Sequence, residues 1–212
     1  MVAMMVNRLK GKVMKITLVK PELMNITNAN GDTFVGGSQE WYEDKRHKKS
    51  GCGPVAASNL IWYIMRKHGV EKDYVKLIRE MYDYITPGIR GVDTSVIFTD
   101  GLLRFASENG MQIRPQVLEM PKKKCDRPNA DTLVDFIITA LHADSPVAFL
   151  VLSNGSVSSL ENWHWVTIIA IDPDTMVVEI SDYGKNISAD IAEWLETSML
   201  GGSLVYIQYE NE

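Results

Sequence analysis

The chain has 212 residues, of which 45% are hydrophobic, and this is enough for a single compact domain with a full core. Its 22 lysines and arginines against 27 acidic residues give a formal net charge of −5, so we expect neither nucleic acid nor a membrane as a partner. The sequence has no apolar run long enough for a signal-peptide core or a membrane span, which favours a cytoplasmic location.

The N-terminal region is predicted to be an arm or strand, and the main domain is predicted at 36–212. Within the first 35 residues, a short alternating run at 13–19 is typical of a strand and is stopped by Pro21. A polar, turn-rich stretch follows. Residues 36–53 are predicted to form a loop, because glycines stand at both of its ends.

A buried central helix is predicted at 54–68, where apolar residues lie on most sides, and Gly69 ends it. Pro54 suits the first turn, since its missing N–H would have no helical partner there. We expect Asp93 or Thr94 to cap a later helix. Further helices are predicted at 73–84, 94–108 and 131–143.

Strand-like runs dominate the sequence after Pro146. One helix is predicted among them, at 188–199. Strands that follow a helical half predict an α+β fold with an antiparallel sheet. The predicted strands are 147–152, 163–171, 176–181 and 204–209.

The two cysteines, Cys52 and Cys125, are too few for a disulfide framework, and their spacing fits no metal site. An intracellular location disfavours a bridge between them. Cys125 follows three lysines, so we interpret it as an exposed loop thiol without a catalytic role. A single cysteine in a distinctive setting, with a distant histidine, is a candidate nucleophile.

Cys52 has such a setting, in Ser50-Gly51-Cys52-Gly53-Pro54 at the start of the central helix. The glycines allow a tight turn and the close approach of another backbone or a substrate. Unpaired N–H groups and the positive end of the helix dipole favour the thiolate, which is the attacking species. The alternative is a small buried hydrophobic residue at a helix start, which is the commoner role of a free cysteine.

His164 stands between two tryptophans in a predicted strand. Burying an imidazole there costs free energy unless its nitrogens are hydrogen-bonded. It is therefore either a core histidine bonded to a backbone carbonyl or a general base. His47, among four basic residues, is interpreted as a solvated loop histidine.

A hairpin follows His164. If 172–174 is a three-residue loop, Ile171 faces Thr175, and the same register places His164 opposite Asp182. Asp182 would then accept the proton of one imidazole nitrogen and leave the other nitrogen facing the thiol. A four-residue loop would shift the pairing by one, and a simple turn former at a strand end is the alternative role for Asp182.

Acyl transfer also needs hydrogen-bond donors for an oxyanion, and the Gln39 amide and the Cys52 backbone N–H are candidates. A glutamine, then Cys-Gly-Pro opening an apolar helix, then a Trp-His-Trp-Val strand that leads through Asp-Pro to a strand ending in Asp resemble papain-like cysteine peptidases. Within them, the chain is similar to the branch related to bacteriocin-leader (double-glycine) peptidases. The resemblance covers roughly residue 36 to the end.

The resemblance implies a papain-like fold, a peptide or amide substrate, and no cofactor. It implies Cys52 as nucleophile, His164 as base and then acid, Asp182 as the residue that orients the imidazole, and Gln39 as oxyanion donor. Gln39 lies 13 residues before Cys52, a longer gap than is usual in the family, so the charged run at 43–49 is expected to loop out.

Three readings of the function follow. The first is a cysteine hydrolase acting on a peptide, isopeptide or small amide, with acyl or peptidyl transfer by the same residues as a variant. The second is an inactive papain-like module that binds peptides, and the third takes Cys52 and His164 as unconnected core residues. We expect no secretion signal and no transporter domain, so the leader-processing role is not carried over.

Overall fold

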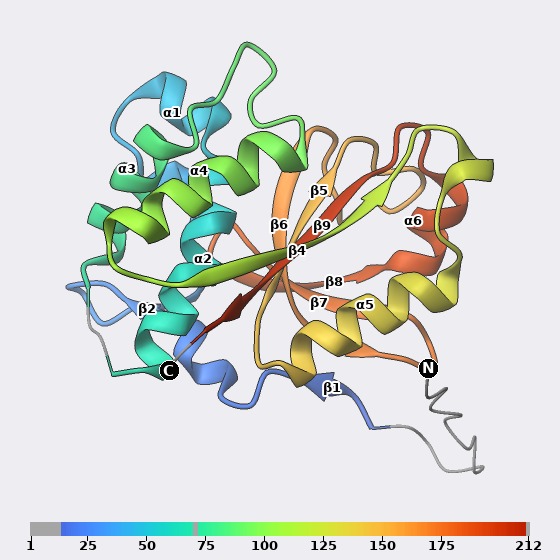
Figure 1. Cartoon of the computed structure of the whole chain (residues 1–212), viewed down its shortest axis with the longest axis horizontal. Coiled ribbons are helices and arrows are strands. Elements are labelled where there is room, and N and C mark those ends of the chain that lie inside the picture. The colour runs from blue at the N-terminus through green and yellow to red at the C-terminus, as the bar shows by residue number, and fades with distance from the viewer. Residues whose placement is uncertain (1–13, 70–71, 211–212) are drawn as a thin grey trace.

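The computed structural model describes residues 14–69 and 72–210 and has the α+β architecture that the sequence predicts (Figure 1). The helices are α1 (Lys45–Ser50), α2 (Cys52–Lys67), α3 (Tyr74–Tyr84), α4 (Ser95–Glu108), α5 (Ala130–His142) and α6 (Ile191–Thr197), with 3-10 turns η1 (Pro21–Met24), η2 (Gln39–Trp41) and η3 (Lys124–Asp126). The strands are β1 (Ile16–Thr17), β2 (Asn25–Thr27), β3 (Thr33–Val35), β4 (Ile113–Met120), β5 (Val147–Val151), β6 (His164–Asp172), β7 (Val177–Asp182), β8 (Lys185–Asp190) and β9 (Gly202–Tyr209).

Within the described residues, the main sheet has seven strands in the order β4-β9-β5-β6-β7-β8, with β1 added against β6. All of its pairings are antiparallel. A separate two-stranded sheet joins β2 to β3. In Figure 1, α1 to α4 gather on one side of the sheet, and α5 and α6 lie at its other side.

The central strand β5 is buried on both faces, which explains its unbroken apolar sequence. Ala148 and Leu150 pack into the core that α2, α3 and α4 share. Val147, Phe149 and Val151 pack into a second core under α5 and α6. The sheet is therefore a layer between two helical layers.

The buried central helix is confirmed as α2, in which every residue from Cys52 to Ile64 is buried. It packs against α3 and against β6. Because the helix begins at Cys52, its first turn lies beside the strand that begins at His164. The central helix thus brings two of the sequence-predicted site residues together.

The charged run before Cys52 was expected to loop out. Instead, most of it forms the helix α1. Asp44 caps this helix, since its Oδ1 accepts hydrogen bonds from the backbone N–H groups of Arg46 and His47 at 2.7 and 3.1 Å. His47 is therefore not a solvated loop residue. Its ring stacks on Tyr82, with ring centroids 3.8 Å apart.

β4 and β8 lie where the sequence analysis predicts no strand. β4 has a mixed sequence that contains Pro115, which is tolerated because this strand is at the sheet edge and pairs with β9 alone. β8 replaces the first part of the helix predicted at 188–199. Only α6 is helical there, and Asp190 caps it by accepting from the N–H of Glu193 at 2.9 Å.

The hairpin between β6 and β7 differs from the predicted one. Asp172 pairs with Val177, so the connection is a four-residue loop at 173–176 and the three-residue loop is wrong. The register then shifts once more, between Ile168 and Ala170. The predicted pairing of His164 directly opposite Asp182 is therefore also wrong.

The N-terminal region takes part in the main sheet through β1, whose Ile16 and Thr17 pair with Ile171 and Ala170. The first residue of the run predicted at 13–19 lies outside the described residues, as does all that precedes it. The division into an arm at 1–35 and a domain at 36–212 stays a prediction. None of the helices in the described part of the chain is long and apolar enough to cross a membrane.

Candidate active site

Cys52 is the first residue of α2, where its backbone N–H is one of those without a partner inside the helix. The side chain is 8% exposed, and both cysteines of the chain are free. Close packing explains the glycines on either side. A Cβ at Gly51 would lie 2.4 Å from the Tyr42 ring, and one at Gly53 would lie 2.7 Å from Val92.

His164 and Asp182 meet at the ends of neighbouring strands. His164 opens β6, Asp182 ends β7, and Nε2 of the imidazole lies 2.7 Å from Oδ1 of the carboxylate. His164 is 5% exposed, and Tyr183 stacks on its ring with centroids 5.3 Å apart. Since Asp182 occupies Nε2, Nδ1 is the ring nitrogen left for Cys52.

The surroundings of His164 favour its protonated form. Burial pulls the pKa of His164 down, but hydrogen bonds to Asp182 and to Cys52, with the charges of both groups, outweigh burial and raise the pKa from 6.5 to about 10. The imidazole therefore carries a proton between a thiol and a carboxylate. This arrangement suits a group that assists a thiolate and later donates a proton.

Gln39 lies in η2, next to a small cavity of about 10 Å³ that Cys52 and His164 also line. Such a cavity has room for about one water molecule. The Oε1 atom of Gln39 is buried and has no hydrogen-bond partner among the described residues. A buried polar atom without a partner is unusual in a protein, and a water or substrate in the cavity would supply one.

Two polar residues that the sequence analysis missed hold the Gln39 segment in place. Asn59, on α2, accepts from the Gly37 N–H at 3.0 Å and donates to Thr167 Oγ1 on β6 at 3.0 Å. Ser181, on β7, donates to the carbonyl of Val35 at 2.6 Å. A buried asparagine inside the apolar run of α2 was the available signal, since such a residue needs hydrogen-bond partners.

A large cleft of about 1130 Å³ opens at Cys52. One wall is α1, and another is the segment that we call the 85–93 loop, which rises above α1 and α4 in Figure 1. The Trp165 indole N–H anchors the end of this loop by donating to the Val92 carbonyl at 2.6 Å. Thr94 then caps α4, as one of the two predicted candidates, by accepting from the Ile97 N–H.

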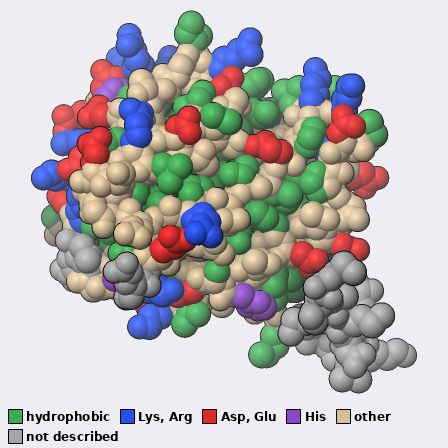
Figure 2. Space-filling view, in the orientation of Figure 1, with side chains coloured by type: hydrophobic (Ala, Val, Ile, Leu, Met, Phe, Trp, Pro, Cys, Tyr) green, Lys and Arg blue, Asp and Glu red, His purple; other side chains and the backbone are tan. Residues whose placement is uncertain are grey.

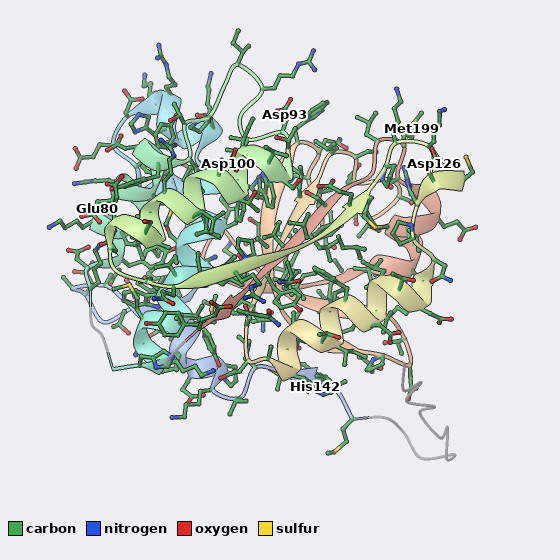
Figure 3. The ribbon with its side chains drawn as sticks, viewed as in Figure 1. Glu80, Asp93, Asp100, Asp126, His142 and Met199 are labelled. Carbon is green, nitrogen blue, oxygen red and sulfur yellow. The ribbon has the colours of Figure 1, made fainter. Side chains whose placement is uncertain are left out.

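Cys125 and His142 lie apart from this site. Cys125 is exposed, and its Sγ contacts Asp126 at 3.5 Å. His142 lies at the end of α5, near the lower edge of the molecule in Figure 3. Among the described residues, no group of three or more histidine, cysteine, aspartate or glutamate side chains could hold a metal ion.

The sequence matches no family model and no curated protein. In structure, the chain is similar to UfSP from C. elegans, with a TM-score of 0.51 and 10% sequence identity. The match covers 98% of this chain and 36% of the UfSP chain, whose fold is papain-like. This chain has a papain-like fold. At this identity, the likeness establishes the fold alone.

Proposed function

We propose that the chain is a cysteine hydrolase that cleaves a peptide or amide bond through a thioester acyl-enzyme. The observation that carries the proposal is the buried imidazole of His164, which bonds Asp182 through Nε2 at 2.7 Å and interacts with Cys52 at the start of α2. A buried imidazole held between a thiol and a carboxylate is the arrangement that activates a cysteine nucleophile. UfSP, the structural relative, is a cysteine protease.

The first half of the reaction forms the acyl-enzyme. The Cys52 thiolate attacks the carbonyl carbon of the scissile amide, a C–S bond forms, and the C=O electron pair moves onto oxygen. The tetrahedral intermediate then collapses and the C–N bond breaks. The leaving nitrogen takes its proton from His164, so the amine departs neutral and a thioester remains on Cys52.

The second half restores the enzyme. Water attacks the thioester carbon while His164 removes a proton from it, and collapse of the second intermediate breaks the C–S bond. The acid is released, and Cys52 and His164 return to thiolate and imidazolium. Asp182 stays ionised throughout and holds the imidazole with Nδ1 toward sulfur.

The oxyanion of both intermediates needs donors, and we assign them to the Cys52 backbone N–H and the Gln39 carboxamide. Gln39 and Cys52 both line the cavity of about 10 Å³, together with His164. An oxyanion there would accept from Gln39 Nε2. The site uses no cofactor in this scheme, because the Cys52 thiolate is the nucleophile and His164 carries out both proton transfers.

A mixed peptide library tests the proposal. Wild-type chain and the Cys52→Ala variant are incubated with the library, and new termini are identified by mass spectrometry. We expect cleavage by the wild type only. Adding an amine nucleophile distinguishes hydrolysis from acyl transfer, since a transferase would place that amine on the new carboxyl end.

The absence of any product, together with a Cys52 thiol that reacts like an ordinary cysteine, would instead favour an inactive peptide-binding module. The relationship to bacteriocin-leader peptidases remains an interpretation of the sequence motifs. The cytoplasmic location also remains a prediction.

A further inference from the structure

The walls of the large cleft carry positive charge. Arg46 and Lys49 reach it from α1, and Arg90 reaches it from the 85–93 loop. All three residues are exposed. No aspartate or glutamate of the described chain lines this cleft. Figure 2 shows Lys and Arg side chains along the upper edge of the molecule, over α1 and over this loop.

Most of this charge is not paired with carboxylates. Within residues 14–69 and 72–210, Arg46, Lys49 and Arg90 form no ion pair, whereas Lys48, outside the cleft, pairs with Glu40 at 3.6 Å. Asp44 caps α1, and its carboxylate also interacts with the charge of Arg46, so among the described residues Lys49 and Arg90 are the cleft cations that neighbouring carboxylates leave free. The positive charge of the cleft is therefore available to a ligand.

Other acidic residues near the cleft point to the same conclusion. Asp93 is the last residue of the 85–93 loop and Asp100 lies on α4 (Figure 3), and neither lines the cleft. The cleft also has exposed apolar side chains, since Ile89 at the tip of the loop is fully exposed and Trp163 is 47% exposed. The cleft thus offers charge and apolar surface together.

The contrast with the rest of the protein makes this cleft distinctive. The whole chain has a formal net charge of −5, so its general field repels an acidic ligand. A cleft lined by charges of one sign focuses the local field and can still attract such a ligand. The local positive field attracts a peptide with carboxylate side chains, and the rest of such a peptide can still make the apolar contacts.

We propose that the cleft selects an acidic peptide, with aspartate or glutamate side chains near the scissile bond. This proposal rests on the proposed function and names the substrate class for the same site. Arg46, Lys49 and Arg90 would contact those carboxylates, while Ile89 and Trp163 cover the apolar part of the peptide. Guanidinium groups suit the task because they bind carboxylates in a bidentate manner.

Two alkylating reagents of similar size test the charge of the cleft directly. Iodoacetate is anionic and iodoacetamide is neutral, so the ratio of their rates at Cys52 reports the field at the thiol. We compare wild type with the double variant Lys49→Glu/Arg90→Glu. The matched control is Lys122→Glu/Lys123→Glu, which changes the net charge equally at the start of η3. Figure 3 shows Asp126 of η3 at the far end of the molecule from α1.

We expect the iodoacetate-to-iodoacetamide ratio to fall about five-fold in the cleft variant at low salt and less at high salt. The ratio should not change in the control. In the peptide library, wild-type cleavage sites should be enriched in flanking aspartate and glutamate, and the cleft variant should lose that enrichment.

Two failures are distinguishable. An unchanged ratio in the cleft variant, at a Cys52 that still alkylates faster than Cys125, would overturn the acidic-peptide proposal and leave the hydrolase intact. A Cys52 that alkylates no faster than Cys125 would overturn the hydrolase and the acidic-peptide proposal with it.

Discussion

His164 Nε2 lies 2.7 Å from Asp182 Oδ1, although the pairing of β6 and β7 does not place the two residues opposite each other. Thr167 pairs with Ser181, and one further step puts Val166 opposite Asp182. His164 precedes Val166 by two residues along β6. Because side chains alternate with a period of two, His164 and Asp182 still share a face of the sheet and can meet diagonally.

The register shift between Ile168 and Ala170 makes this contact possible. Before the shift, Ala170 pairs with Glu179, and that register would place Asp182 opposite Thr167, three residues from His164. An odd offset puts two side chains on opposite faces. The four-residue loop alone would put the His164 and Asp182 side chains on opposite faces of the sheet. The register shift returns them to the same face.

Replacing Asp182 should slow the alkylation of Cys52. The fall should be smaller where the new side chain can still accept a hydrogen bond from His164. Asp182→Asn keeps an acceptor for the imidazole but loses the charge, so we expect a fall of roughly ten-fold in the alkylation rate near neutral pH. Asp182→Ala also removes the hydrogen bond that orients the imidazole, so we expect the alkylation rate to fall roughly 100-fold. Rates are measured by mass spectrometry with Cys125 as reference. Equal rates in both variants and the wild type would show that Asp182 does not position the imidazole.

Asn59 should be important for stability as well as for the position of Gln39. It accepts from the Gly37 N–H and from the Tyr74 hydroxyl, at 3.0 and 2.6 Å, and donates to Thr167. Asn59→Ala leaves buried partners unpaired, and we expect the free energy of unfolding in urea to fall by about 3 kcal/mol.

The exposed Asn186, which donates to Glu179 at 3.1 Å, provides the control. We expect Asn186→Ala to change the free energy of unfolding by less than about 0.5 kcal/mol. If Asn59→Ala costs no more than this control, the hydrogen bonds of Asn59 do not hold the fold around the site.

The raised pKa of His164 predicts how stability depends on pH. Its pKa is about 10 in the folded chain against 6.5 for an ordinary histidine, so the folded state binds the proton more tightly. This contribution is fully present below pH 6.5 and is lost as the pH rises through about 10. The gap in urea midpoint between wild type and His164→Ala should therefore narrow as the pH rises across this range. A gap that stays constant or widens would contradict the raised pKa.

The sequence was sufficient to predict the central helix, the strand-rich part of the chain after Pro146, and the contact of His164 with Asp182. These features depend on long apolar periodicity and on strand alternation, which are the strongest signals in a single sequence. The contact was predicted for a partly mistaken reason, since a bulge cannot be identified from the Trp-His-Trp-Val sequence or from the Asp-Pro turn.

The failures of prediction have physical causes of their own. α1 is a short, highly charged helix whose main signal is the Asp44 cap, and β4 is an edge strand in which Pro115 argues against a strand. β8 was missed because a helix follows it directly, and the polar Lys185-to-Asp190 sequence gives no clear period. The charge of the cleft could not be predicted, because it depends on where α1 and the 85–93 loop meet in space.

The pH dependence of iodoacetamide alkylation at Cys52 tests the central claim most directly. Wild type and His164→Ala are alkylated across a pH series, and mass spectrometry separates Cys52 from the exposed Cys125. The account predicts that at about pH 6 the wild-type Cys52 reacts at least roughly ten-fold faster than Cys125, and that His164→Ala abolishes this advantage. A Cys52 that reacts no faster than Cys125, with no effect of His164→Ala, would contradict the account.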